Sequence, residues 1–350
     1  MKNILNRLTD WEHWPFLLFY FPISYAWLWS YIKSGSFWFF TASNPTLTFG
    51  GLEGESKSEM YKQLPAHLCP RSIYITPSAP FADVVQQVRM QRMDYPFIVK
   101  PDVGMKGILF RKIENDAHLE KYHRHVPVNY IIQQFLDLPH EVSVFYYRKP
   151  GTSKGRITAL IQKDLLEVTG DGTSALSELL KRHPDATGLL PKIMKQQGKH
   201  LEGVLGNGEK FCLSHIANLV NGAKFKNLYD KVDDKLVGVF DDISRNNQFY
   251  YGRYDIKCFS VDDIKEGNNF YILEFNGAGS VPNHIYTGTY TLMQAYKEIL
   301  MHWRLLLEAS EINNKKGHRY WSFIKGHCFF KNSKKHFNML KKLDKQLFLN

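Results

Sequence analysis

The sequence predicts a body of mixed helices and strands, of the α/β or α+β class, between about residues 70 and 310. Short apolar runs typical of strands alternate there with longer segments that read as helices. This alternation excludes an all-helical chain. The strand-like segments are YPFIVKPD (95–102), NYIIQQFL (129–136) and HEVSVFYYR (140–148), and the helix-like segments are FADVVQQVRMQRM (81–93), ALSELLKRH (175–183) and YTLMQAYKEILMHWRLLLEA (290–309).

Two pairs of strands support this class. A short turn at 137–139 joins the second and third strand-like segments. Further along, GRYD (252–255) and LEFN (273–276) lie on two strands, and the segment between them is predicted as a hairpin with its loop around 266–269. The hairpin indicates that the strands of the second pair lie side by side.

The polar residues of the second pair form a candidate metal site. Arg253 and Asp255 are two residues apart, as are Glu274 and Asn276, so each pair shares one face of its strand. Pairing of the strands would bring Asp255, Glu274 and Asn276 together. Three oxygen ligands on rigid strands suit Mg²⁺, which binds carboxylates together with substrate phosphates. The alternative is two amphipathic strands with polar outer faces.

Composition places bounds on the protein. Its 350 residues can bury a substantial core in two or three lobes, and the net charge is +11. The cysteines Cys69, Cys212, Cys258 and Cys328 have no metal-binding or redox spacing, which favours a reducing compartment over a disulfide framework. The apolar stretch near the start is too aromatic for a cleavable signal and lacks the small residues of a cleavage site.

Residues 11–40 are strongly aromatic. No charge occurs between Phe16 and Ile32, but this stretch is shorter than the ~20 residues of a spanning helix, and Pro22 interrupts it. Trp and Tyr favour the membrane–water interface, so we expect a monotopic or re-entrant anchor within residues 1–48. The alternative is a buried helix that packs against the core or against a second copy of the chain in a homodimer.

The tail, residues 311–350, is basic. From Lys315 onward ten Lys or Arg residues accompany one acid, Asp344, and large aromatic residues are interspersed. This mixture suits an anionic membrane surface. Nucleic acid is the competing partner, but no nucleic-acid motif supports it, and we expect none. A solvated basic helix is the third interpretation.

Two further segments suggest a nucleotide site. Lys100 ends a strand and is followed by a glycine loop, GMKG (104–107), that contains Lys106. Such loops bring backbone N–H groups to phosphates, and the lysines neutralise them. The turn after QQFL (133–136) offers an apolar wall to adenine, with Glu141 for ribose hydroxyls. Taken singly, these segments also fit an ordinary turn, a solvated lysine and an exposed strand charge.

In this order the segments resemble the ATP-grasp superfamily, in particular carboxylate–amine ligases such as D-alanine–D-alanine ligase, over about residues 80–290. EVTGDGTSALSELL (167–180) and LSHIANLVNGAKF (213–225) are similar to segments of cyanophycin synthetases and bifunctional glutathione synthetases. The resemblance implies an α+β fold in which two lobes grip ATP, with the ATP-grasp domain at 81–310.

The resemblance also implies residue roles. Arg253 and Lys106 would stabilise the transferring phosphoryl group, and the family usually has Glu where this chain has Gln133. The ATP-binding residues would be Lys100, Lys106, Gln133, Gln134, Phe135, Leu136, Glu141 and Lys163; the ligands of one or two Mg²⁺, with Mn²⁺ as the alternative, would be Asp255, Glu274 and Asn276; and the substrate contacts would be Asn218, Gly277, Gly279, Ser280, His284 and Tyr286.

The implied reaction activates a carboxylate as an acyl phosphate, releases ADP, and transfers the acyl group to an amine. The family's usual domain before the ATP-grasp lobes is truncated to residues 49–80 here. Segment 44–65 is a candidate replacement, with an anion-binding turn at Ser56-Lys57, and a plain loop is the alternative. We expect a cytoplasmic ligase, peripheral on the inner membrane face, that acts on a lipid-linked substrate. The alternatives are a soluble amino-acid or peptide ligase and a non-catalytic ATP-binding scaffold.

Overall fold

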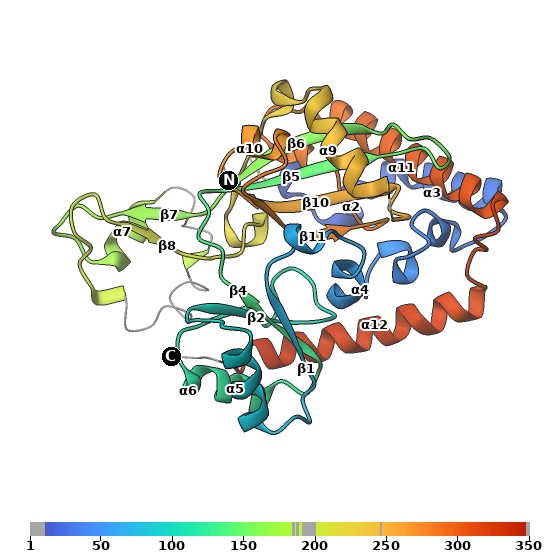
Figure 1. The fold of residues 1–350 in the computed structure, drawn as a ribbon. Helices are drawn as coiled ribbons and strands as arrows, with labels where there is room; N and C mark the ends of the chain where they lie inside the picture. Colours follow the sequence, from blue (N-terminus) through green and yellow to red (C-terminus); the bar gives the residue numbers. More distant parts are fainter. Residues whose placement is uncertain (1–10, 184–185, 187–188, 191–200, 246, 348–350) are drawn as a thin grey trace. The chain divides into compact units, whose positions relative to one another are not determined.

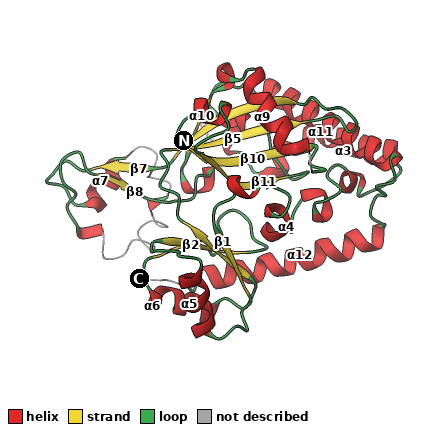
Figure 2. Cartoon of the chain, in the orientation of Figure 1, coloured by secondary structure: helices red, strands yellow, loops and turns green. Residues whose placement is uncertain are grey.

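The computed structural model describes residues 11–183, 186, 189–190, 201–245 and 247–347 (Figure 1). The chain is α+β, as predicted, and its strands form antiparallel pairs flanked by helices (Figure 2). It divides into two compact units, one formed by Met1–Ile161 with Asn227–Leu349 and the other by Gln162–Lys226. All four cysteines are described, and each lies outside any disulfide bond.

The first unit contains a small antiparallel sheet of order β1-β4-β2-β3. Helices α5 and α6 pack against it, and apolar residues such as Val84, Phe97 and Leu119 fill the core between them. Each helix begins where the sequence stops favouring a strand; Asn115, for example, caps α6 by accepting a hydrogen bond from the His118 amide at 2.9 Å. The elements are β1 Ser72–Ile75, α5 Phe81–Met90, β2 Phe97–Pro101, β3 Arg111–Ile113, α6 Asp116–His125 and β4 Tyr130–Gln134.

A larger sheet of order β11-β10-β5-β6-β9 forms the rest of this framework. One face packs on α9 and α10 through residues such as Val144, Tyr254 and Phe240. The opposite face is apolar at one end, where Phe145 and Tyr251 pack with α11. The elements are β5 His140–Tyr147, β6 Arg156–Asp164, β9 Lys224–Asn227, α9 Asp234–Arg245, β10 Tyr251–Cys258, α10 Val261–Lys265, β11 Phe270–Asn276 and α11 Leu292–Lys315.

The aromatic N-terminal segment lies against α11. Phe19 of α2 (Phe16–Tyr20) and Ile23 of the 3-10 turn η2 (Phe21–Ile23) are buried in a cluster with α11. On α3 (Ser24–Ser34), the Trp27 ring centroid lies 5.2 Å from that of Trp303. The opposite side of the segment is exposed, with Leu17 and Phe21 each 80% accessible. Among the described residues, no helix combines the length and apolar character that crossing a bilayer requires.

The basic tail forms helix α12 (Phe323–Asp344), which is anchored to the small sheet of the same unit. Phe337 and Leu340 join that sheet's core, and the one acid of α12, Asp344, lies 2.9 Å from Arg111 and accepts a hydrogen bond from the Leu109 amide. Most of the lysines face outward. The predicted helical tail is therefore confirmed.

The second unit holds strands β7 (Glu167–Thr169) and β8 (Lys210–Cys212) and helix α7 (Leu176–Arg182). Within its GDG turn, the Asp171 carboxylate accepts hydrogen bonds from the side chain and amide of Ser174 and from the Thr173 amide, which lowers the pKa of Asp171. The remaining helices among the described residues are α4 Lys57–Tyr61 and the 3-10 turns η1 Trp11–His13, η2 Phe21–Ile23, η3 Phe39–Ala42, η4 Thr48–Gly51, η5 Ala66–Leu68, η7 Leu219–Asn221, η8 Tyr229–Lys231 and η9 Asn283–Tyr286.

Candidate active site

The two acid-bearing strands pair as predicted. β10 and β11 are antiparallel, with Asp255 opposite Glu274 and Arg253 opposite Asn276. Their connection contains helix α10 before the loop, so it is longer and more structured than the predicted hairpin. Opposed residues on neighbouring antiparallel strands have Cβ atoms about 5 Å apart, so both carboxylates belong to one site.

A β-bulge in β11 decides which way Glu274 points. Ile272 and Phe275 both belong to the core under the sheet although they are three residues apart, and the pairing register shifts between them. Strict alternation would have placed Glu274 on the same side as Ile272. The extra residue, Leu273, turns Glu274 and Asn276 to the opposite face, as bulges commonly do beside functional sites.

Asp255 lies at the centre of a hydrogen-bond network and is nearly buried. The Arg253 guanidinium donates from Nε to Oδ1 at 3.1 Å and from Nη2 to Oδ2 at 3.0 Å. The Asn276 amide donates to Oδ2 at 3.3 Å, and the Ser143 hydroxyl donates to Oδ1. The carboxylate is thus held in one orientation by β5, β10 and β11 together.

The pKa of the Arg253 side chain is affected by several nearby acids. Burial opposes its charge, but Asp255, with Glu274 and Glu141, outweighs burial and raises the pKa of the guanidinium above its usual value. Its Nη1 also donates to the Val281 carbonyl at 3.5 Å. Arg253 therefore remains charged and fixed beside the carboxylates.

Two lysines approach Glu274. The Lys57 Nζ lies 3.5 Å from Glu274 Oε1 and donates to the Gly104 carbonyl at 3.3 Å, with only 10% of its side chain exposed. Burial, followed by repulsion from Lys57, lowers the pKa of Lys100 to about 8, although Glu274 and Glu141 act in the other direction. The predicted residues Lys100, Glu141 and Glu274 thus lie within electrostatic range of one another.

Segment 53–57 adds further acids. Burial is the main cause that raises the pKa of Glu55 to about 7, and repulsion from Glu274 and Glu53 adds to it. Glu55 Oε2 and Glu53 Oε1 are buried with no hydrogen-bond partner among the described residues. A buried carboxyl group in this setting favours either a bound cation beside it or its own protonated form.

The glycine loop presents Lys106 to solvent. Lys106 has φ 54° and Gly107 has φ 75°, and both angles belong to the left-handed region that favours glycine. The Lys106 side chain is exposed. An exposed ammonium group on this turn is compatible with contact to a ligand that enters the site.

The hinge residues lie at the end of β4. The Gln133 Nε2 donates to the Tyr61 hydroxyl at 2.8 Å and to Ser72 Oγ at 2.9 Å. The Gln134 Oε1 accepts from Arg71 at 3.2 Å. The amide of Gln133 is therefore engaged by protein groups. Phe135 and Leu136, which follow, are half-buried, and the ammonium of Lys112 lies 5.1 Å from the Phe135 ring centre.

The glycines after β11 permit a close backbone approach. The amides of Ala278 and Gly279 donate to the carbonyls of Gly50 and Gly51 at 3.0 and 2.9 Å. A Cβ on Gly277 would lie 2.4 Å from the Gly50 carbonyl oxygen, so only glycine fits there. The Ser280 hydroxyl donates to the Asn276 carbonyl. Segment 50–52 is thus a wall of this part of the site.

The other predicted residues lie elsewhere. Lys163 is buried on β6 and Asn218 caps η7, and both belong to the second unit. His284 lies 3.3 Å from Glu298 in a separate group on η9 and α11, and Tyr286 packs near Trp11.

The donor set at the strands fits a hard divalent cation. Two carboxylates and one amide on one sheet face are the oxygen donors that Mg²⁺ accepts, and two cationic groups, Arg253 and Lys57, now balance the acids. Three residues beside this set were not among the predicted ligands: Lys57, Tyr61 and Ser143. Ser143 could have been found from its spacing to Glu141 on the same strand, and the predicted anion-binding turn at Ser56-Lys57 already included Lys57.

No protein-family model matches the chain, and no curated protein matches it in sequence. Solved structures do resemble it. The bifunctional glutathione synthetase of Pasteurella multocida is 15% identical, with a TM-score of 0.37 over 70% of this chain and 36% of that one. D-alanine–D-alanine ligase of Bacillus anthracis is 12% identical, with a TM-score of 0.40 over 75% and 68%.

A third similar structure is the ATP-grasp ligase PsnB with its minimal precursor. It is 12% identical, with a TM-score of 0.38 over 71% of this chain and 60% of that one. The chain is thus similar to solved ATP-grasp ligases, as its motifs suggested. It spans between about a third and two thirds of the length of these three proteins.

Proposed function

We propose that the protein is an ATP-grasp ligase that joins a carboxylate to an amine. One observation carries this proposal: Asp255, Glu274 and Asn276 share one face of two paired strands, with Arg253 bonded to Asp255 and Lys57 beside Glu274. Bound Mg²⁺-ATP would supply the phosphoryl group that activates the carboxylate. The chain's own contribution is positioning and charge stabilisation, so no protein nucleophile is required.

The cations have distinct proposed tasks. Lys100 and the exposed Lys106 hold the ATP phosphates, and Arg253 stabilises the charge that develops on the transferred group. Lys57 reaches the same acids and is a further candidate for phosphate or carboxylate binding. Adenine would lie against the hinge, with its ribose at Glu141. The ATP-binding residues of this proposal outside the cation set are Gln133, Gln134, Phe135 and Leu136.

Metal and substrate residues complete the assignment. Asp255, Glu274 and Asn276 would hold one or two Mg²⁺, with Mn²⁺ as a substitute. The substrate carboxylate would lie beside Gly277, Gly279 and Ser280, where the chain already packs on segment 50–52.

We also propose that this ligase works at the inner face of a membrane, on an amphiphilic or lipid-linked substrate. The support is the exposed apolar side of α2, η2 and α3, together with Phe323 and Ile324 at the start of α12, which are 62% and 75% accessible. The Phe37 and Phe323 ring centres lie 5.8 Å apart, so the two groups adjoin. The outward lysines of α12 would complement anionic lipid headgroups.

The deciding experiment measures ADP release. Purified wild-type protein and an Asp255→Asn/Glu274→Gln variant are incubated with Mg²⁺-ATP and pooled acids and amines, including a membrane lipid extract. The matched control is Asp262→Asn/Glu266→Gln, which removes two exposed acids from the connection between the same strands. We expect release with one particular pool, unchanged in the control and at least about 100-fold lower in the site variant.

The other outcomes separate the alternatives. Release with small water-soluble pools alone would favour a soluble amino-acid or peptide ligase. Tight Mg²⁺-ATP binding without release from any pool would favour a non-catalytic scaffold. Release that persists in the Asp255→Asn/Glu274→Gln variant would contradict the assignment of these strands.

A further inference from the structure

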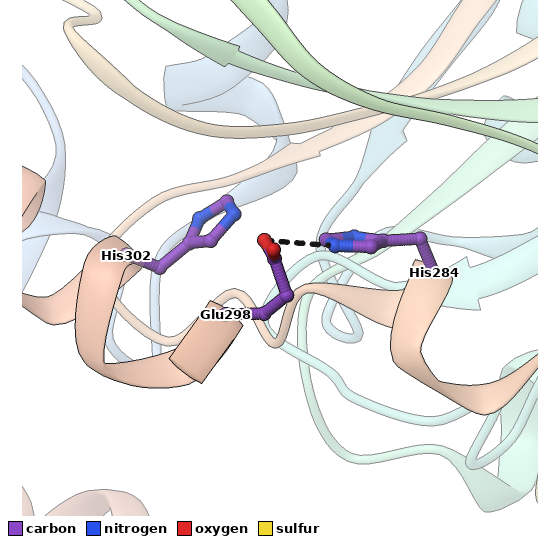
Figure 3. A group of neighbouring side chains, drawn as sticks. All are labelled: His284, Glu298 and His302. Atoms are coloured by element: carbon purple, nitrogen blue, oxygen red, sulfur yellow. Dashed lines mark hydrogen bonds and ion pairs between the residues drawn. The ribbon is translucent and has the colours of Figure 1, made fainter. Parts of the chain in front are cut away.

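We infer that His284, Glu298 and His302 form a binding site for a divalent transition-metal ion of the zinc class. Each side chain offers one ligand atom, and these atoms all lie within 4.8 Å of one another. Figure 3 shows the three side chains directed toward a common space. The group is separate from the carboxylates of β10 and β11, and the inference does not depend on the proposed ligase activity.

The local sequence sets this geometry. Glu298 and His302 are four residues apart on α11, so one helical turn places them on the same face. His284 comes from η9, and its Nε2 lies 3.3 Å from Glu298 Oε2. Two elements therefore converge on one point.

Buried nitrogens without partners indicate that something is missing from the site. His302 is 0% exposed, and neither of its ring nitrogens has a hydrogen-bond partner among the described residues. The Nδ1 of His284, which is 4% exposed, is in the same condition. Native proteins rarely leave buried polar atoms unpaired, and a bound ion is one of the few explanations. A simple His284–Glu298 ion pair would leave both nitrogens of His302 unexplained.

The ring of His302 is held in place, because its centre lies 4.3 Å from that of Phe145 in an edge-on contact.

The chemical types of the three ligand atoms determine which ion the site favours. Two imidazoles with one carboxylate suit Zn²⁺, which commonly takes such a set and keeps a fourth position for water. Mg²⁺ prefers oxygen ligands and belongs at the other site. Glu298 is 29% exposed in its side chain and provides a route from solvent.

A bound ion would connect the candidate active site to α11. The chain runs from Gly277 past Val281, whose carbonyl accepts a hydrogen bond from Arg253, to His284 on η9. Coordination would tie this segment to the long helix. The ion is thus expected to stabilise the segment that borders Arg253.

Metal analysis tests the inference directly. Protein grown with added Zn²⁺ is dialysed against a weak chelator, and bound metal is measured by mass spectrometry. We expect about one Zn²⁺ per chain, and at least about 10-fold weaker binding in Glu298→Gln and in His302→Leu. The matched control is Glu311→Gln, an equally partly exposed acid on the same helix at 25%. Asp255→Asn should also retain the ion.

Thermal unfolding and cobalt spectra give independent readouts. Zn²⁺ should raise the Tm of the wild type and of Glu311→Gln but not of Glu298→Gln. Co²⁺ should give the intense visible bands of a tetrahedral site in the wild type but not in Glu298→Gln or His302→Leu. A wild type that binds no more Zn²⁺ than Glu298→Gln would overturn the inference. So would a His302→Leu variant that is more stable than the wild type with Zn²⁺ present, because a merely buried histidine gains from an apolar replacement.

Discussion

At the scale of single residues, the positive charge of Lys57 offsets the negative charge of the acids at the candidate site. Its ammonium lies beside Glu274, and its charge contributes to the lowered pKa of Lys100. Two lysines and one glutamate therefore share a partly buried region, where each charge depends on the others. A ligand that carries phosphates would find cations already gathered there, which is the arrangement that a nucleotide site requires.

Glu55 makes the stability of the protein depend on pH. Its pKa is raised from 4.5 to about 7, so between these values the folded state binds more protons than the unfolded state. The contribution of Glu55 to stability is therefore fully present below pH 4.5 and is lost as the pH rises to about 7. We predict that Glu55→Gln raises the free energy of unfolding by about 3 kcal/mol at pH 8 and changes it little at pH 4.

Urea unfolding of the wild type and the variant at several pH values tests this prediction. The difference between the two proteins should grow across the window from about pH 4.5 to 7. Glu202→Gln, at an exposed glutamate, is the control and should show no such trend. A Glu55→Gln variant whose added stability is the same at every pH would show that Glu55 does not titrate in this way.

At the scale of elements, segment 44–61 holds the site together. The buried Asn44 amide donates to the Tyr251 carbonyl at 2.9 Å and accepts from the Tyr250 amide at 2.8 Å. Gly50 and the following residues pack on the glycines after β11, and helix α4 is joined to the end of β2 because the Ser58 amide donates to Asp102 at 2.9 Å. The segment predicted as a replacement for a missing domain thus contacts both sheets of the first unit.

Tyr61 connects this segment to the bulge that aims Glu274. Its hydroxyl donates to the Leu273 carbonyl at 2.5 Å and accepts from Gln133 at 2.8 Å. We predict that Tyr61→Phe lowers the free energy of unfolding by about 1–3 kcal/mol, because two buried polar groups lose a partner while the ring packing remains. ADP release should fall as well. Tyr229→Phe, at a 51% exposed tyrosine, is the control in urea unfolding, and a loss in Tyr61→Phe no larger than the control's would refute the prediction.

The elements also show what the sequence can and cannot predict. Periodicity located α5, β2, β4, β5 and α7 to within a few residues, because each carries a clear apolar pattern. The pairing of Asp255 with Glu274 followed from a two-residue spacing. The bulge at Leu273 could not be predicted, since it depends on packing by Met60 and Tyr61 from a distant segment. The contact of Lys57 with Glu274 is equally non-local.

At the scale of the whole molecule, the net charge of +11 is combined with one exposed apolar face that adjoins the basic helix α12. Apolar side chains from α2, η2 and α3 stay exposed although their neighbours are buried, and they adjoin the exposed start of the basic helix α12. Contiguous exposed apolar surface commonly marks an interaction site. The residues of this face are Phe16, Leu17, Leu18, Phe21, Tyr25, Leu28, Trp29, Ile32, Phe37, Phe323 and Ile324.

We predict that this face binds anionic membranes. In vesicle flotation, the wild type should rise with vesicles that contain phosphatidylglycerol and less with neutral vesicles. Added salt should weaken binding, because the lysines of α12 act through screened charge. The variant Leu17→Ser/Phe21→Ser/Trp29→Ser, at positions 80%, 80% and 61% exposed, should lose at least about 90% of the floated protein.

The control for flotation removes exposed apolar residues from other elements. Tyr74→Ser/Met90→Ser/Met293→Ser changes positions that are 44%, 73% and 70% exposed and should float as the wild type does. If the wild type fails to float and instead forms a stable dimer that Leu17→Ser/Phe21→Ser/Trp29→Ser disrupts, a second copy of the chain covers the face. The apolar face would then serve assembly, and a water-soluble substrate would become the better proposal.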